Sequence, residues 1–379
     1  MSKKLVYALL VCLALSLLLA SAAQAKPPKP PSLEERVAAL EALVAAQGAK
    51  IASLETRVTE LQANPVLALA PYVRVDPNSM NGVAGPNIVF WRANVHVYNG
   101  TAANGLGNLI VGDNIAPSSP PLAIADRSGS DNLIVGNFNR FPGLGCFVAG
   151  ENNVASGLWA SVSGGRFNTA SGQDASVSGG TQNTAEGHAS SVSGGSSNTA
   201  SGAAASVSGG YGNIASADAS SVTGGRDNTA SGTLSSTSGG AGNHASGVGA
   251  SVSGGWANEA SGDFASVSGG QGNTSSYESA SVSGGQLNHA GGDYASVSGG
   301  FGSSALGGWA SVSGGNANTA RSDFASISGG DTNEATGLGA SVSGGSGNKA
   351  SGMYASVSGG SSCILNDYVG RAGGSYHTP

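Results

Sequence analysis

The chain has 379 residues, of which 63 are glycine and only 10% are charged, and its net charge is −6. The glycine share is about twice the average for soluble proteins, and the charged share is less than half of it. An acidic chain with 16 Lys and Arg residues lacks the clustered positive charge that nucleic-acid binding requires, and its low charge is unlike that of a disordered acidic tail.

Residues 1–25 have the pattern of a secretory signal peptide. Two lysines precede an apolar stretch over residues 5–19, and the tripeptide Ala23-Gln24-Ala25 provides a cleavage site of the small–x–small type. An uncleaved membrane anchor is the alternative, but the apolar stretch is short for a membrane span. We expect a secreted or cell-surface bacterial protein, with the periplasm as a further location, and no transmembrane segment in the mature chain.

A proline-rich linker over residues 26–31 leads into a heptad pattern over residues 32–64. Apolar residues alternate at spacings of three and four from Leu33 to Leu61, which predicts an α-helical coiled coil. A serine at the start of this segment and a glutamate three residues later predict a capping box at the N-terminus of the helix.

The coiled coil is expected to join three copies of the chain. β-branched residues at one core position with leucine at the other favour two strands, but Gln47 places a polar side chain in the core, which a wider three-stranded core can hydrate. The segment from Arg36 to Glu41 also resembles the pattern of short trimeric coiled coils, in which the arginine forks onto an acidic group of a neighbouring helix. A homotrimer is therefore expected, with a dimer as the alternative. The residues expected at the contact are Arg36, Val37, Leu40, Glu41, Val44, Gln47, Ile51, Leu54, Val58 and Leu61.

Residues 65–107 are expected to form a β-rich connector. Two segments, 87–91 and 94–98, are rich in β-branched and aromatic residues and are bounded by Asn, Gly and Pro, which is typical of short strands. Residues 108–153 are expected to form degenerate turns that cap the repeat array, because terminal repeats of a solenoid lack a neighbour on one face.

Within this cap, residues 132–139 and 146–153 align with the later copies of the repeat. The alignment places Leu133 and Phe147 at the position of Val162. These turns carry bulkier apolar residues than the regular ones, as a cap requires.

A fifteen-residue unit follows in fourteen unbroken copies, the first of which begins at Ala160 and the last at Ala355. Its consensus is Ala-Ser-Val-Ser-Gly-Gly-x-x-Asn-Thr-Ala-Ser-Gly-x-x, and we number its positions 1 to 15. A short, strict period predicts a solenoid. The β-roll is expected to span residues 154–363, with a C-terminal tail over residues 364–379.

Both halves of the unit alternate with period two, as strands do. Positions 1, 3 and 5 share one face of the first half, and positions 9, 11 and 13 share one face of the second. Each turn of the solenoid is expected to contain two strands of about five residues, joined by the variable pairs and stacked in parallel on the next turn. The predicted fold class is therefore an all-β solenoid, a flat parallel β-roll with two short strands per turn, preceded by an N-terminal coiled coil.

Two constant elements of the unit have expected roles. The Gly-Gly pair allows the chain to reverse with positive φ. The asparagine is expected to stack its amide along the solenoid axis and to tolerate left-handed geometry at a bend. The interior is thin, with one valine in most turns, so the rolls are expected to gain stability by packing on one another through their Ser and Ala faces.

Cys146 and Cys363 lie at opposite ends of the array, and fourteen turns at about 4.8 Å per turn separate them by about 65–70 Å. A disulfide requires Cα atoms within about 7 Å of each other. The two cysteines cannot pair within one straight chain, so each is either a free thiol or bonded to the same cysteine of a neighbouring chain.

The repeats resemble the head domains of trimeric autotransporter adhesins through segments 161–165 (Ser-Val-Ser-Gly-Gly) and 170–172 (Ala-Ser-Gly). The resemblance implies a left-handed parallel β-roll that associates in threes at the cell surface. The sequence departs from that family in its fifteen-residue period and in a coiled coil that precedes the head. Residues 365–379 are not expected to form the membrane anchor of that family.

Aligned positions of successive copies form columns along the solenoid. Asp263, Glu278 and Asp293 occupy position 14, where oxygen ligands about 5 Å apart would suit a calcium ion. Solvated acids are the interpretation that we favour, so neither a metal nor a cofactor is assigned.

The neighbouring column places aromatic side chains at position 15 of three consecutive copies, namely Tyr294, Trp309 and Phe324. Their rings are expected to stack as a ladder. Packing along the edge of the solenoid or against a neighbouring chain is the interpretation that we favour, and a platform for sugar rings is the alternative.

The sequence does not predict an enzyme, because no cluster of acids, bases and nucleophiles stands out. We expect a secreted or cell-surface structural or adhesive protein that acts by multivalent display on a trimeric β-roll rod, with a surface glycan or matrix component as its ligand. An inert extracellular fibre or matrix protein is the first alternative. A polysaccharide-active β-helix enzyme and an ice-binding protein are less favoured alternatives.

Overall fold

The structure is a computed structural model of the whole chain. It describes residues 29–64, 69, 71–78, 86–90, 94–97, 106–113, 126–368 and 371–372. The expected signal peptide lies outside these described residues. The chain divides into two units, Met1–His96 and Val97–Pro379, and each is considered by itself.

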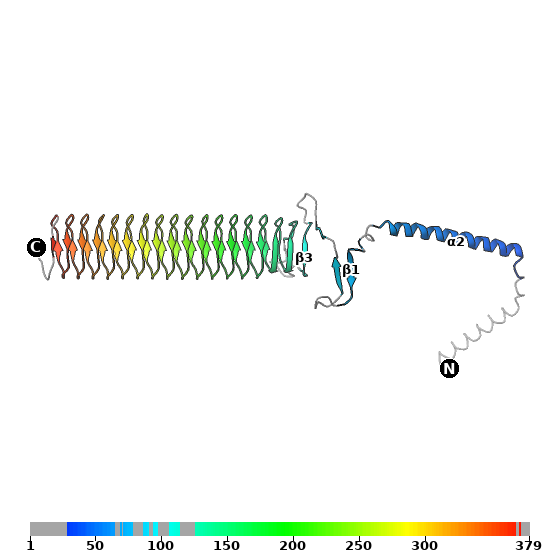
Figure 1. Ribbon diagram of the computed structural model, residues 1–379, viewed down its shortest axis with the longest axis horizontal. Helices are drawn as coiled ribbons and strands as arrows, with labels where there is room; N and C mark the ends of the chain where they lie inside the picture. Colours follow the sequence, from blue (N-terminus) through cyan, green and yellow to red (C-terminus); the bar gives the residue numbers. More distant parts are fainter. Residues whose placement is uncertain are drawn as a thin grey trace, which may run out of the picture. The chain divides into compact units, whose positions relative to one another are not determined.

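Among its described residues, the first unit contains one long helix, α2 (Leu33–Gln62), which confirms the helix expected over residues 32–64 (Figure 1). The predicted capping box begins it. The backbone N–H of Glu35 donates to Ser32 Oγ at 3.1 Å, and the backbone N–H of Ser32 donates to Glu35 Oε2 at 2.7 Å. These bonds satisfy donors that have no partner within the helix, and the acidic first turn complements the helix dipole.

A two-stranded antiparallel ribbon follows in the same unit. Strand β1 (Val73–Asp76) pairs with strand β2 (Asn87–Phe90). The prediction of a strand at 87–91 is confirmed over the described residues 87–90. The prediction at 94–98 is wrong over residues 94–97, which have no regular structure, because β2 pairs with the upstream strand instead of a downstream one.

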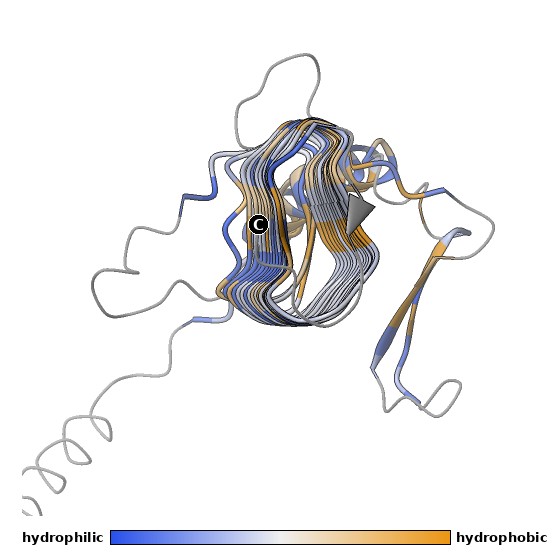
Figure 2. Cartoon of the chain, turned by 90° about the vertical axis from the view of Figure 1, so that its left-hand side faces the viewer, coloured by the Kyte–Doolittle hydropathy of each residue, from blue (hydrophilic) through white to orange (hydrophobic). Residues whose placement is uncertain are grey.

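The second unit is a parallel β-solenoid of about 16 turns with about 15 residues per turn, as the period predicted. Its two sheets line opposite sides of a narrow interior (Figure 2). The first sheet contains β3 (Leu109–Val111), β4 (Leu133–Asn137), β5 (Phe147–Glu151), β7 (Ser161–Val162), β9 (Ser176–Val177), β11 (Ser191–Val192), β13 (Ser206–Val207), β15 (Ser221–Val222), β17 (Ser236–Thr237), β19 (Ser251–Val252), β21 (Ser266–Val267), β23 (Ser281–Val282), β25 (Ser296–Val297), β27 (Ser311–Val312), β29 (Ser326–Ile327), β31 (Ser341–Val342), β33 (Ser356–Val357) and β35 (Arg371–Ala372).

The second sheet has fifteen strands, which alternate along the chain with those of the first. It contains β6 (Val154–Ala155), β8 (Thr169–Ala170), β10 (Thr184–Ala185), β12 (Thr199–Ala200), β14 (Ile214–Ala215), β16 (Thr229–Ala230), β18 (His244–Ala245), β20 (Glu259–Ala260), β22 (Thr274–Ser275), β24 (His289–Ala290), β26 (Ser304–Ala305), β28 (Thr319–Ala320), β30 (Glu334–Ala335), β32 (Lys349–Ala350) and β34 (Ile364–Leu365). The last strand of each sheet lies within the expected tail, so the solenoid continues beyond residue 363.

The regular strands have two residues each, which is shorter than the predicted five. A third ladder, of single-residue parallel bridges, runs along position 7 from Glu151 and Arg166 to Ser346 and Ser361. The strands are short because the backbone bends between these pairing points. Positive φ recurs at three positions of the turn, as at Gly165 (+78°), Phe167 (+59°) and Asp174 (+57°), and only short stretches between them keep sheet geometry.

The second glycine of the Gly-Gly pair is required by this geometry. Gly165 has positive φ, and a Cβ atom there would lie 2.1 Å from the carbonyl oxygen of Gly180 in the next turn. The predicted reversal at the pair is thus confirmed for its second residue. The asparagine was expected to tolerate left-handed geometry at the bend, but the residue before it, such as Phe167, takes the positive φ instead.

The interior is formed by positions 1, 3, 9, 11 and 13. This confirms the predicted alternation except at position 5, which was predicted to face inward and faces outward instead, because the strand ends at position 3. In the first regular turn these are Ala160, Val162, Asn168, Ala170 and Gly172, all of them buried. The buried apolar residues are small, so hydrogen bonds and close backbone contacts make a larger share of the stability than in an ordinary core.

The cap turns differ from the predicted alignment by one residue. Phe147 pairs with Ser161 and Val148 with Val162, so Val148, and Ile134 before it, take the buried position, while Leu133 is exposed. Strands β4 and β5 are fourteen residues apart, one fewer than the regular period. The missing residue lies between the strand and the following glycine, so the glycines align as expected and the strands do not.

Candidate interaction surfaces and the asparagine ladder

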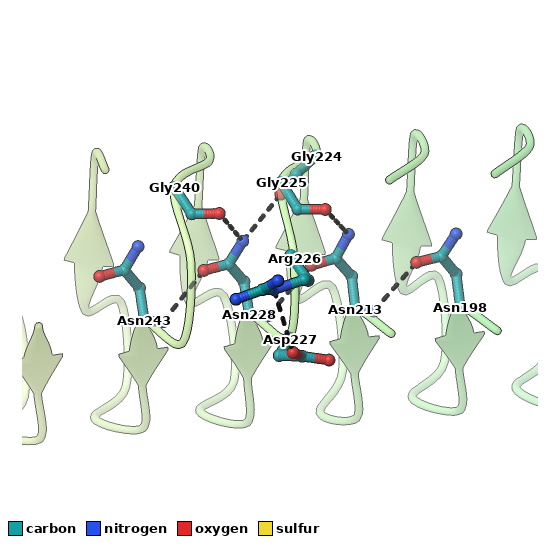
Figure 3. Close-up of polar contacts among 9 residues, drawn as sticks. All are labelled: Asn198, Asn213, Gly224, Gly225, Arg226, Asp227, Asn228, Gly240 and Asn243. Atoms are coloured by element: carbon teal, nitrogen blue, oxygen red, sulfur yellow. Dashed lines mark hydrogen bonds and ion pairs between the residues drawn. The ribbon is translucent and has the colours of Figure 1, made fainter. Parts of the chain in front are cut away.

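The buried asparagines form a hydrogen-bonded ladder along the solenoid (Figure 3). The backbone N–H of Asn228 donates to Oδ1 of Asn213 in the preceding turn at 3.0 Å. Its own Nδ2 donates to the carbonyl oxygens of Gly224 at 2.9 Å and of Gly240, in the next turn, at 3.0 Å. Asn228 Oδ1 in turn accepts the backbone N–H of Asn243 at 3.0 Å. Each side chain therefore satisfies three backbone groups of two successive turns, its own and the next, and fixes their register.

The ladder runs along the axis, as expected, but nearly all of its bonds join amide to backbone rather than amide to amide. Asn198 Nδ2 and Asn183 Oδ1 are close enough for a direct bond at 3.2 Å. The ladder runs without interruption from Asn139 to Asn288 and again from Asn318 to Asn348. The sequence predicted the asparagine column but not its hydrogen-bond partners. These partners are glycine carbonyl oxygens, whose positions only the structure gives.

The expected coiled-coil seam on α2 is exposed along its whole length. None of the residues of the helix is buried, and Leu40 and Val44 are 65% and 62% exposed. A regular row of aliphatic side chains with nothing packed on it is unusual for a monomer, and such rows mark association surfaces.

By length and composition alone, α2 is also apolar enough to cross a membrane. Glu41 and Lys50 lie inside its apolar stretch. Each charge costs about 2.5–3.5 kcal/mol at the centre of a bilayer. The heptad spacing and these charges favour packing against other helices over a membrane span.

The aromatic column stacks as predicted. The ring centroids of Tyr294 and Trp309 are 5.2 Å apart with an interplanar angle of 6°, and those of Trp309 and Phe324 are 5.3 Å apart with an angle of 4°. Both faces of Trp309 therefore contact a neighbouring ring, and the ring edges point to solvent. Since sugar rings stack on open aromatic faces, this ladder offers such faces only at its two ends.

The acidic column at position 14 binds the backbone of the preceding turn. Asp263 Oδ1 accepts the backbone N–H of Val248 at 3.0 Å, and Asp323 Oδ1 accepts that of Gly308 at 2.9 Å. Glu278 instead accepts from the Tyr294 hydroxyl at 3.5 Å. Over the described part of the chain, no three His, Cys, Asp or Glu side chains gather closely enough to hold a metal ion. The structure therefore does not bring Asp263, Glu278 and Asp293 together as a calcium site.

Charged and imidazole groups on the outer face of the second sheet also have partners within the chain. Glu334 contacts Lys349 Nζ at 2.9 Å and Arg321 at 3.4 Å, and the hydrogen bond from Lys349 is the main reason that the pKa of Glu334 lies below its ordinary value. His244 and His289 each share a hydrogen bond with a serine of the preceding turn, at 2.8 and 2.7 Å. Burial lowers the pKa of His289, which favours its neutral form.

The outer face of the first sheet is formed by serine at positions 2 and 4 and by the first glycine of each pair. No steric constraint within the chain explains why this position is glycine rather than a larger residue. A Cβ atom would meet no atom within 4 Å at thirteen of the fourteen copies, and at Gly164 it would lie 3.9 Å from the nearest atom. Eleven of the fourteen also lie outside the left-handed φ region, and Gly329, Gly344 and Gly359 have φ of +150° to +159°.

Both cysteines lie in the interior. Cys146 Sγ donates to the carbonyl oxygen of Gly157 at 3.2 Å, and burial raises the pKa of its thiol. Cys363 takes the place of the asparagine in the last copy, where its backbone N–H donates to Asn348 Oδ1 at 2.9 Å. Neither sulfur is at the surface, so an interchain disulfide would require the ends of the solenoid to open.

Comparison with known proteins identified no relative. No family model matches the chain, and no curated protein matches it.

Proposed function

We propose that this chain is a secreted or cell-surface structural protein that assembles as a homotrimer through α2 and presents its solenoids as parallel rods for multivalent contact. The exposed aliphatic seam of α2 carries this proposal. Burying an aliphatic side chain of this size contributes about 1.5–3 kcal/mol, so burying the eight aliphatic residues of the seam on each helix would strongly favour association. No described part of the chain packs on these residues.

The resemblance of the repeat to trimeric adhesin heads supports three copies over two, as does Gln47 in the core of the seam. The first glycines add support, because each costs roughly 0.5–1 kcal/mol relative to alanine and gains no contact within the chain. Fourteen turns at about 4.8 Å and a strip about 10 Å wide give roughly 700 Å² per chain, close to the roughly 800 Å² per partner of a standard interface.

The test is the solution mass of the mature chain, measured by light scattering, for the wild type, Leu40→Asp and Ala42→Asp. Residue 40 lies in the seam, and residue 42 lies on the opposite face of the same helix. The wild type and Ala42→Asp are expected at three times the chain mass, and Leu40→Asp at one. A monomeric wild type at micromolar concentration would overturn the proposal, and a mass of two chains would replace the trimer with a dimer.

Two hypotheses about the ligand lead to different experimental outcomes. A surface glycan or matrix component would be bound by the variable side chains at positions 7, 8, 14 and 15, with three rods multiplying weak contacts by about 10²–10⁴ in avidity. An inert fibre is favoured by two observations, the acids bonded to backbone and the covered faces of Trp309. Glycan-array binding by the trimer, compared with Trp309→Ala, separates them, since the inert fibre predicts no binding by either protein.

A further inference from the structure

Ser303 interrupts the asparagine ladder at position 9 of the turn 295–309. In the preceding turn, Asn288 makes the usual three bonds, accepting from the Ser303 N–H at 3.0 Å and donating to the carbonyl oxygens of Gly284 at 2.9 Å and Gly300 at 3.0 Å. A serine is too short to make the equivalent bonds. The Ser303 hydroxyl is fully buried and has no hydrogen-bond partner in the protein.

The loss extends to the backbone groups that an asparagine at residue 303 would serve. By the repeat, these are the N–H of Asn318 and the carbonyl oxygens of Gly299 and Gly315. The Gly315 oxygen keeps the bond from the Phe301 N–H at 2.9 Å, while no protein group of the described chain bonds to the Asn318 N–H or the Gly299 oxygen. In every regular turn the same three groups converge on one amide, so here they converge on one place beside the serine hydroxyl.

We propose that a single water molecule is bound at this place and takes over the role of the missing amide. It accepts from the Asn318 N–H and from the Ser303 hydroxyl, and it donates to the oxygens of Gly299 and Gly315. These four bonds are the full capacity of water, and buried waters make about three on average. Asparagine has two more non-hydrogen side-chain atoms than serine, and their volume is close to the roughly 30 Å³ that one water occupies.

The partner set selects water over an ion. A cation would be repelled by the inward N–H of Asn318, and an anion by the two carbonyl oxygens. Only a small neutral group that both donates and accepts satisfies all four partners at once.

Ser275 provides a matched contrast within the same chain. Its hydroxyl is also fully buried without a protein partner, but it stands at position 11, where every other copy has alanine except the last, which has Leu365. There the serine adds an atom to a packed site, and the neighbouring backbone groups keep their regular bonds. No water is expected beside Ser275.

The experiment is a high-resolution crystal structure of the mature chain, as the wild type and as Ser303→Asn. The wild type is expected to show one water within about 2.7–3.2 Å of the four named groups, with none beside Ser275. In Ser303→Asn the amide replaces the water and restores the three ladder bonds, and the melting temperature rises. A wild-type structure without this water, or with the Ser303 hydroxyl bonded directly to a glycine carbonyl, overturns the proposal.

Water relaxation dispersion measured on the same two proteins gives an independent readout without crystals. The wild type is expected to contain one more long-lived water per chain than Ser303→Asn. Equal numbers in the two proteins would overturn the proposal. Ser303→Ala keeps all three backbone partners, so it is expected to retain the long-lived water, and its loss there would contradict the assignment of those partners.

Discussion

Helix α2 and the solenoid solve the problem of stability in opposite ways. The helix carries large aliphatic side chains and buries none of them, so in the proposed trimer its stability would come from the other chains. The solenoid buries mainly alanine, valine and asparagine, and it satisfies nearly every described backbone group through the neighbouring turns. The difference indicates that hydrogen bonding and close backbone packing stabilise the solenoid, whereas hydrophobic burial would drive the proposed assembly.

The sharpest test of this contrast compares alanine substitutions at the two glycines of one Gly-Gly pair. Gly240→Ala is expected to destabilise the solenoid by about 4 kcal/mol, because φ is +81° there and the Cβ atom would lie 2.1 Å from the Gly255 oxygen. Gly239→Ala, whose Cβ would meet nothing within 4 Å, is expected to stabilise the solenoid by roughly 0.5–1 kcal/mol. Urea unfolding of both variants in the Leu40→Asp background measures the difference, and equal losses would refute the steric explanation.

The next largest effect is expected from the ladder. Asn228→Ala removes the three bonds of the side chain, to the Gly224 and Gly240 oxygens and from the Asn243 N–H, and leaves these backbone groups unpaired, at a cost of about 3 kcal/mol. Asn316→Ala, on the surface, serves as the control and is expected within about 0.5 kcal/mol. Thermal unfolding followed by circular dichroism measures both. A small effect at Asn228 would mean that the strands alone hold the register.

A smaller effect is expected at the aromatic column. Trp309→Ala loses two stacked neighbours, at about 1–2 kcal/mol. Trp256 is the matched control, since it is 55% exposed against 56% for Trp309 and has no stacked ring among the described residues. If both substitutions cost the same in urea unfolding, stacking contributes nothing beyond the burial of the side chain.

The smallest effect concerns pH. The pKa of Glu334 is lowered in the folded chain, chiefly by Lys349, so its contribution to stability is present above its ordinary pKa of 4.5 and is lost as pH falls through the lower folded value. The pair is near the surface, so only a few tenths of a kcal/mol are expected. Unfolding between pH 5 and about 3, compared with Glu334→Gln, isolates this term. An unchanged difference between the two proteins across that range would contradict it.

The features of the fold that the sequence predicted correctly follow from the strict repeat. A strict period places equal residues one above another, so the stacking of Tyr294, Trp309 and Phe324 followed from the sequence. Alternation also predicted the buried positions except for position 5, which faces outward. The short strands and the third ladder could not be predicted from the sequence. They depend on positive φ at variable positions such as Phe167, and a position that is not always glycine gives no sign of positive φ in the sequence.

The candidate sites were foreseen less well for a related reason. Asp263 looked like a free turn acid, and only the placed backbone reveals the N–H of Val248 that it accepts. The shift of register at Ile134 arises from one missing residue, which an alignment anchored on the glycines assigns to the wrong side of the strand. Hydrogen-bond partners that come from a neighbouring turn cannot be identified from the sequence of one unit. They are identified only when the three-dimensional stacking of the units is known.

The constant register between turns has a consequence for how such a protein can change over time. Because each turn bonds only to the turns before and after it, the gain or loss of one complete unit creates a junction identical to those already present. Unequal recombination within the gene would then lengthen or shorten the rod in steps of about 4.8 Å without a new folding problem. The number of copies is therefore a property that selection can adjust freely, while any change inside the unit must satisfy its neighbours on both sides.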